Sequence, residues 1–126
     1  MPLNGHRILL VEDELLIAFN LESIVREAHG EVAAHAASLA KALKLADAPN
    51  LSLAILDFRL GSKDSLPVAT KLYAAGVPFI FHTASNVPEL LGIWPRVPIV
   101  QKPAAPGRLV SALVSLVTKR PSYCAA

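Results

Sequence analysis

The sequence predicts an α/β fold in which five parallel strands form a doubly wound sheet. Short apolar runs alternate with longer stretches whose apolar residues recur every three or four positions, which is the pattern of repeated strand–helix units. The run at residues 53–56, Leu-Ala-Ile-Leu, is apolar throughout, as expected for a strand buried on both faces. Because crossovers between parallel strands are right-handed, a doubly wound sheet is the simplest topology for this order of elements.

The predicted strands are short and end where polar residues begin. They are expected at residues 7–11, 31–35, 53–56, 78–82 and 98–101. The second run is rich in alanine and therefore carries the weakest strand signal, whereas the fourth is rich in aromatic residues, which favour strands.

The predicted helices are bounded by residues with known capping preferences. They are expected at about residues 14–28, from 38 to before Pro49, at 65–75 and at 106–118, with a short irregular helix between 84 and 97. Gly30 and Gly76 follow the first and third helices, as C-terminal glycines do. Ser38 is the expected N-cap of the second helix, and Pro67 suits the first turn of the third. Two prolines and a glycine interrupt residues 84–97, so any helix there is expected to be short.

The composition predicts one soluble domain that covers residues 1–126, with a core at about 6–118 and a tail at 119–126. A chain of 126 residues that is 53% apolar and 17% charged can bury a full core and is not expected to be disordered. A net charge of +2 does not favour nucleic acid or an anionic membrane as a partner. A single cysteine, Cys124, the lack of a signal sequence and the absence of a long apolar run predict a cytoplasmic location.

Polar residues follow four of the predicted strands at the point where each strand ends. Glu12 and Asp13 follow the first strand, Asp57 the third, Thr83 the fourth and Lys102 the fifth. In open α/β sheets, ligands bind beyond the carboxyl ends of the strands, so these side chains are expected to meet. Three acids, a hydroxyl and an ammonium together indicate a site for a divalent cation and a phosphoryl group.

The residue types suit phosphoryl transfer to a carboxylate. Neighbouring carboxylates repel one another unless a cation lies among them, and Mg²⁺ is the hard cation that such oxygen ligands usually bind. Asp57 is the expected nucleophile, Mg²⁺ and Lys102 are expected to neutralise the phosphoryl charge, and Thr83 is expected to bind a phosphoryl oxygen.

Each of these residues also has a simpler interpretation. Asp57 could be a turn aspartate, Glu12 and Asp13 could form an acidic first helical turn with Glu14, and Lys102 could be a solvated surface lysine. The combination at four strand ends favours the site. The histidines lack the spacing of a zinc site and are interpreted as structural; they are His6, His29, His35 and His82.

The ordered set of an acid pair, an aspartate, a threonine and a Lys-Pro step resembles the receiver domain of two-component response regulators, over essentially the whole chain. The resemblance implies a flavodoxin-like receiver fold with strand order 2-1-3-4-5. It implies that Asp13 binds Mg²⁺ directly and Glu12 through water, and that Asp57 and the backbone carbonyl of Arg59 complete the metal site. It also implies that Asp57 accepts phosphate from a histidine kinase or a histidine phosphotransfer protein.

By the same resemblance, the protein is of the single-domain, chemotaxis-regulator-like type and is not a conventional enzyme. It would accept a phosphoryl group, lose it by its own hydrolysis, and act on a downstream protein or as a homodimer, without nucleic acid or membrane. Ile99 stands where many receivers have an aromatic switch residue. The segment of residues 84–97 lies in a stretch that is shorter and richer in proline than the corresponding stretch of most receivers. We expect residues 84–97 to rearrange on phosphorylation. The run from Phe79 to Thr83 partly resembles a Phe-X-Phe-Ala-Thr-Gly-X-Tyr subgroup motif, which His82, Ala84 and Ser85 break.

Three other functions are alternatives to a phosphoacceptor receiver. A pseudo-receiver would keep the fold as an interaction or dimerisation module without phosphorylation, and Ile99 leaves that alternative open. A hydrolase that forms an aspartyl phosphate on small phosphoesters commonly has a second aspartate two residues after the nucleophile, where this chain has Arg59. Flavin or dinucleotide binding needs a phosphate loop after the first strand, where Glu12, Asp13 and Glu14 would repel a phosphate.

Overall fold

The computed structural model describes residues 2–84 and 96–118, and in that part of the chain a five-stranded parallel sheet separates two layers of helices. The strand order is β2-β1-β3-β6-β7. The strands of this sheet are β1 (Arg7–Val11), β2 (Glu31–Ala36), β3 (Leu53–Leu56), β6 (Phe79–Thr83) and β7 (Ile99–Gln101). The predicted α/β fold and its order 2-1-3-4-5 are confirmed, with β6 and β7 as the fourth and fifth predicted strands.

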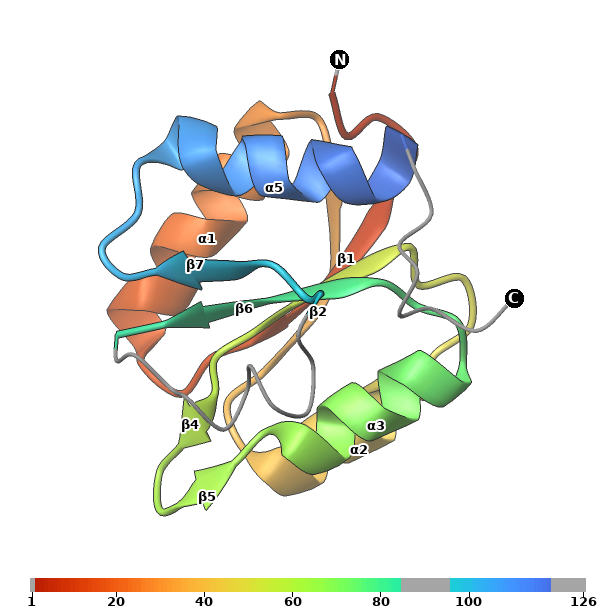
Figure 1. Cartoon of the computed structure of the whole chain (residues 1–126), viewed down its shortest axis with the longest axis vertical. Coiled ribbons are helices and arrows are strands. Elements are labelled where there is room, and N and C mark those ends of the chain that lie inside the picture. Colours follow the sequence, from red (N-terminus) through yellow and green to blue (C-terminus); the bar gives the residue numbers. More distant parts are fainter. Residues whose placement is uncertain (1, 85–95, 119–126) are drawn as a thin grey trace.

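The helices lie in pairs on the two faces of the sheet. They are α1 (Leu15–Glu27), α2 (Leu39–Leu45), α3 (Leu66–Ala74) and α5 (Pro106–Thr118). Figure 1 shows α1 and α5 on one face and α2 and α3 on the other. Because both faces are covered, all four residues of β3 are buried, which is why that strand reads as an uninterrupted apolar run.

Local signals set the start of α2 and of α3 and the end of α3 at Gly76 as the sequence predicted, but the left-handed residue after α1 is His29, with a φ of +68°, and not Gly30. The Ser38 hydroxyl accepts a hydrogen bond from the Lys41 amide at 3.2 Å and so caps α2. Pro67 lies in the first turn of α3, where no amide donor is needed. The helix α5 turns one apolar stripe toward the sheet, and the fully or nearly fully buried members of that stripe are Leu109, Leu113 and Leu116.

Two segments differ from the sequence-based expectation. Residues 59–64, expected to be a polar loop, form an antiparallel hairpin of β4 (Arg59–Leu60) and β5 (Lys63–Asp64). Gly61 occupies the turn with a φ of +63°, which glycine adopts without strain, and strands of two residues are too short to give a periodic signal. Leu3, which was assigned to no element, is fully buried, and its amide donates to the Ala28 carbonyl at 2.9 Å.

Several predictions concern residues outside the described part of the chain. These are the short irregular helix within residues 84–97, for which residues 85–95 are not described, and the tail at residues 119–126 with Cys124. Among the described residues, no helix has the length and apolar character needed to span a membrane.

Candidate functional site

Three carboxylates converge at the carboxyl edge of the sheet. Glu12 and Asp13 directly follow β1, and Asp57 directly follows β3. The two strands are parallel neighbours in which Val11 pairs with Leu56, so the residues after them emerge side by side. One oxygen from each carboxylate lies within 4.8 Å of the others. The register of β1 and β3 therefore assembles an acidic cluster from residues that are 44 or 45 positions apart in sequence.

Lys102 reaches into this acidic cluster from the end of β7. Its Nζ donates hydrogen bonds to Glu12 Oε1 at 2.7 Å and to Asp57 Oδ2 at 3.1 Å. The three side chains are nearly inaccessible to solvent, with exposed fractions of 9% for Lys102, 1% for Glu12 and 8% for Asp57. The Lys102–Pro103 peptide bond is cis. Lys102 therefore lies among the acids at the strand ends, as the sequence predicted, and bonds to both Glu12 and Asp57.

Thr83 ends β6 at the same edge and is 1% exposed. Its backbone carbonyl accepts a hydrogen bond from the Lys102 amide at 2.8 Å. The neighbouring register, in which Leu56 pairs with Phe81, brings the end of β6 next to Asp57. All the strand-end residues that the sequence singled out thus lie at one edge of the sheet.

The β4–β5 hairpin folds back onto the acidic cluster. The Gly61 amide donates to Asp13 Oδ2 at 2.9 Å, and the Arg59 amide lies 3.4 Å from Asp57 Oδ1. The Arg59 guanidinium itself lies over the Phe58 ring, 5.1 Å from the centroid. The hairpin therefore supplies backbone donors to two of the carboxylates, a contribution that sequence reasoning missed because it had assigned these residues to a loop.

The site carries an excess of negative charge. Burial raises the pKa of Glu12 to about 7; its hydrogen bond from Lys102 opposes this shift, and the nearby Asp57 adds to it. Burial lowers the pKa of Lys102, but its bonds to Glu12 and the charge of Asp57 outweigh burial, so the net shift is upward. Among the described residues, Asp13 and Asp57, together with the ionised fraction of Glu12, outweigh the single ammonium of Lys102. A compact divalent cation fits this donor set, because hard oxygen ligands in a partly buried cluster are what Mg²⁺ binds.

His35 is a residue of the site that sequence reasoning missed. Its Nε2 lies 2.8 Å from the Glu12 carbonyl oxygen, which can only accept, so Nε2 carries the hydrogen. The Glu12 amide donates to the Ala36 carbonyl at 3.0 Å. The end of β2 thus holds the backbone of Glu12 on both sides. The available signal was the position of His35 at the predicted end of the second strand, the same edge at which the other site residues were expected.

His82 lies beside the site in an apolar environment. It is 5% exposed, and neither ring nitrogen has a hydrogen-bond partner among the described residues. Burial, followed by the positive charge of Lys102, lowers the pKa of His82 to about 4. The sequence interpretation as a structural histidine did not foresee an imidazole without a partner.

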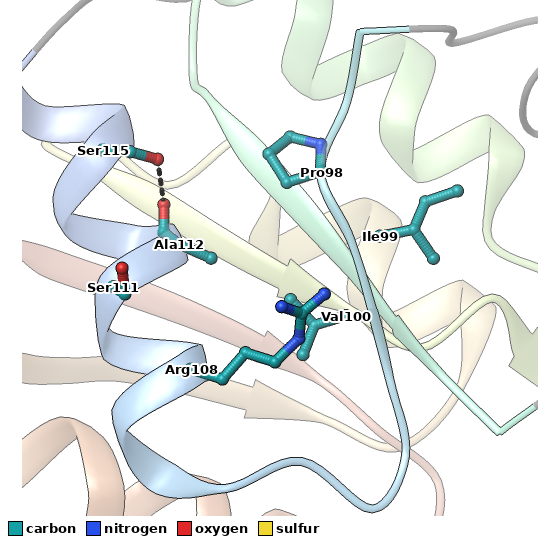
Figure 2. Close-up of a pocket in the computed structure, with 7 residues that line it drawn as sticks. All are labelled: Pro98, Ile99, Val100, Arg108, Ser111, Ala112 and Ser115. Carbon is teal, nitrogen blue, oxygen red and sulfur yellow. Dashed lines mark hydrogen bonds between the residues drawn. The ribbon is translucent and has the colours of Figure 1, made fainter.

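A wider hollow of about 530 Å³ lies elsewhere, between α5 and β7 (Figure 2). Its lining includes Arg108 and Ser111 of α5 together with Val100 of β7. In Figure 2 the Ile99 side chain extends from β7 on the side away from α5. None of the carboxylates of the acidic cluster lines this hollow, so it is separate from the strand-end chemistry.

Comparisons with known proteins agree with the fold. No family model matches the chain. The transcriptional regulatory protein PdtaR of Mycobacterium tuberculosis is 28% identical over 86 residues, which are 68% of this chain and 42% of PdtaR. The chain therefore spans less than half the length of this curated relative.

The similar solved structures cover nearly the whole chain. SdrG from Sphingomonas melonis Fr1 is 32% identical, with a TM-score of 0.79 and coverage of 93% of this chain and 98% of SdrG. A response regulator receiver protein from Sinorhizobium medicae WSM419 is 24% identical, with a TM-score of 0.82 and coverage of 91% and 96%.

Two further structural neighbours are described by their partners or roles. They are CheY in a complex with CheX, BeF₃ and Mg²⁺ from Borrelia burgdorferi, and PhyR from Bartonella quintana, called an anti-anti-sigma factor. At 16% and 23% identity these two show the fold alone. With SdrG matched over 98% of its length, the fold and the comparisons agree: the chain belongs to the receiver domains of response regulators.

Proposed function

We propose that this receiver domain accepts a phosphoryl group on Asp57 in a Mg²⁺-dependent reaction, and that phosphorylation switches its contacts with other proteins. The observation that carries the proposal is the buried Lys102 ammonium, which bridges Glu12 and Asp57 at 2.7 and 3.1 Å within a cluster of three carboxylates. A solvated surface lysine, which is the simpler interpretation of Lys102, would not be buried between two acids. A phosphoryl-transfer site needs this combination because the incoming group is an anion.

Glu12, Asp13 and Asp57 would hold the Mg²⁺, together with the backbone carbonyl of Arg59. When bound, the ion supplies the positive charge that lets an anionic phosphoryl group approach the carboxylates. The backbone donors of the hairpin, Gly61 to Asp13 and Arg59 to Asp57, orient the carboxylates before any ligand arrives. Such preorganisation is most of what phosphoryl transfer requires of a protein.

In the transfer step, a carboxylate oxygen of Asp57 forms a bond to phosphorus while the bond from phosphorus to the donor nitrogen breaks. The electron pair of that bond leaves with the donor imidazole. Lys102 already lies 3.1 Å from Asp57 Oδ2, so a short movement of its ammonium would pair it with a phosphoryl oxygen. Thr83 ends β6 at the same edge, and its hydroxyl would donate to another phosphoryl oxygen. Water later attacks the phosphorus, the bond from phosphorus to the carboxyl oxygen breaks, and inorganic phosphate leaves while the Asp57 carboxylate is regenerated. The protein thus resets itself without acting as a conventional enzyme.

The proposed donor is a histidine kinase or a histidine phosphotransfer protein. Three large apolar side chains are exposed on the first turns of α1: Leu15 at 69%, Leu16 at 86% and Phe19 at 73%. They begin two residues after Asp13, so a protein donor that reaches Asp57 would cover them. The downstream partner is proposed to be another protein or a second copy of this chain; the structural neighbour CheY likewise forms a complex with another protein, CheX.

The test is phosphorylation of the purified chain by radiolabelled acetyl phosphate with Mg²⁺. We expect an acid-stable, base-labile label on the wild type and on Asp47→Asn, whose carboxylate pairs with Lys71 on the surface. We expect no label on Asp57→Asn or after removal of Mg²⁺ with EDTA. A folded wild type that stays unlabelled with Mg²⁺ would contradict the proposal and favour an interaction module that works without phosphorylation.

A further inference from the structure

A small cavity borders His82 on the side of the sheet that α1 and α5 cover. It has a volume of about 130 Å³ and lies between α1, the end of β6 and the loop that joins β7 to α5. Ile17 and Leu109 form apolar walls, and Asn20, His82 and Lys102 contribute the polar ones. We propose that this cavity, which we call the His82 cavity, binds a small uncharged molecule that carries both a hydrogen-bond donor and a hydrogen-bond acceptor.

The first argument is the unsatisfied imidazole. His82 is 95% buried, and neither Nδ1 nor Nε2 has a hydrogen-bond partner in the described part of the chain. Buried polar side-chain atoms in native proteins nearly always have a partner, so a buried imidazole without one calls for a group that the protein does not supply. Since His82 lines the cavity, the cavity is a space beside the ring that such a group could occupy.

The second argument concerns charge. Burial keeps His82 neutral at pH 7, so one nitrogen donates and the other accepts. The Lys102 ammonium is already engaged by Glu12 and Asp57. An anion in the cavity would lie close to these two carboxylates, and a cation would lie close to the ammonium. An uncharged occupant avoids both costs, and one that carries a donor and an acceptor can bond to a ring nitrogen whether that nitrogen is the acceptor or the donor of the neutral ring.

The third argument is size and wall chemistry. An engineered apolar cavity of about 150 Å³ accommodates benzene, so a cavity of this volume suits a ring of five or six atoms. The same volume would hold about four water molecules at roughly 30 Å³ each, and each water needs two to four polar partners. Walls such as Ile17 and Leu109 do not offer that many. An amphipathic ring fits these walls better than a water cluster.

The test uses pyrazole as the probe, because it is an uncharged five-membered ring with one N–H donor and one nitrogen acceptor. Benzene, of similar size but without polar groups, is the matched control. Binding to the full chain is followed by the NMR signals of the His82 ring and of the Ile17 and Leu109 methyl groups. We expect saturable pyrazole binding in the millimolar range, at least tenfold tighter than that of benzene.

Substitution of His82 distinguishes recognition by hydrogen bonding to its ring from non-specific binding in an apolar cavity. In His82→Leu we expect the affinity for pyrazole to fall at least tenfold. Benzene should still bind, and the NMR signals of the Leu109 methyl groups would report its binding. Should that variant fail to fold, His82→Gln provides a polar replacement with a shorter reach, and a tenfold loss is again expected. His6→Gln, a histidine change outside the cavity and outside the acidic cluster, should bind pyrazole like the wild type.

Three outcomes would overturn the proposal. One is pyrazole binding no tighter than benzene, and another is pyrazole affinity unchanged by both His82 substitutions. The third is no saturable binding of either probe, which would mean that water alone occupies the cavity. None of these measurements requires phosphorylation of Asp57, so the proposal stands or falls separately from the proposed function.

Discussion

Glu12 shows how strongly single residues in this site are held. Its side chain is buried against Lys102, its amide donates to Ala36, and its carbonyl accepts from His35. The burial that raises its pKa to about 7 would be costly for an isolated carboxylate, so its contacts must hold it there. Of these contacts, the one from His35 can be removed without touching any charged group of the acidic cluster.

We predict that His35→Ala weakens Mg²⁺ binding about tenfold, the lower range for loss of a partner that orients a metal ligand. The reason is that the Glu12 backbone loses the donor at 2.8 Å that fixes its carbonyl. Isothermal titration with Mg²⁺ measures the change. His35→Gln, which keeps a side-chain N–H donor, should recover most of the affinity, and His6→Gln should not alter it. Equal Mg²⁺ affinity for His35→Ala and the wild type would show that His35 does not position Glu12.

His82 should make the free energy of unfolding fall at acidic pH. Its pKa is about 4 in the folded protein against 6.5 for an ordinary histidine, so the unfolded chain binds more protons between these values. Stability from this residue is therefore fully present above pH 6.5 and is lost as the pH falls toward 4. Between pH 7 and pH 5 we expect a loss on the order of 2 kcal/mol in the free energy of unfolding.

Urea unfolding of the wild type and His82→Leu at both pH values, without Mg²⁺, measures this loss. Glu12 has the opposite dependence, because its raised pKa makes the folded form bind more protons as the pH falls from 7 to 4.5. The difference between the two proteins cancels that contribution. Parallel pH dependences for the two proteins would mean that His82 is solvated or paired in the folded state.

At the scale of elements, periodicity and capping residues predicted the main strands and helices well. Ser38, Pro67 and the stripe of α5 act locally, and local signals are visible in a sequence. The β4–β5 hairpin was missed because each strand has two residues and the fold of the hairpin depends on Gly61 reaching Asp13. Leu3 was missed because its burial depends on how α1 and β1 pack around it, and the residues next to it in sequence give no signal of that packing.

Gly30, between α1 and β2, is a position where this packing can be tested. A Cβ there would lie 2.9 Å from Ile8 Cδ1 and from Val25 Cγ1, and 3.2 Å from Leu3 Cβ. Because these neighbours are fully buried, we predict that Gly30→Ala lowers the free energy of unfolding by about 1–3 kcal/mol.

The matched control is Gly107→Ala in α5, where a Cβ would meet nothing within 4 Å and should gain up to about 1 kcal/mol of helix propensity. The measurement is the denaturant midpoint of each variant compared with that of the wild type, with an unchanged dependence of the free energy of unfolding on denaturant concentration. If Gly30→Ala were as stable as the wild type, the close packing of Leu3, Ile8 and Val25 around Gly30 would be incorrect.

At the scale of the whole molecule, the acidic cluster and the exposed residues of α1 lie on one side of the protein. Leu16 and Phe19 expose apolar surface to water in the free chain, which is unfavourable, and they are not part of its core. Under the proposed function, they are where a protein donor would gain contact area while its phosphohistidine reaches Asp57. Acetyl phosphate needs no such surface.

We predict that Leu16→Ser and Phe19→Ser each slow phosphotransfer from a phosphorylated histidine phosphotransfer protein about tenfold, a loss typical of a central apolar contact. Initial rates with that donor and with acetyl phosphate are compared for each variant. The acetyl phosphate rate should stay at the wild-type level. If both rates fell together, the site rather than the docking surface would be altered, and if neither fell, the donor would bind elsewhere.

The amino-acid sequence by itself determined the order of strands and helices and placed Glu12, Asp13, Asp57, Thr83 and Lys102 at strand ends. These features depend on residue spacing and on the rule that parallel strands end at one edge, so they need no coordinates. Only the tertiary structure showed that Lys102 bonds to Glu12, 90 residues away, that His35 and Gly61 hold the acid pair, and that His82 is buried beside a cavity. Such contacts depend on how side chains from separate elements pack together, and the spacing of residues along one segment carries no information about that packing.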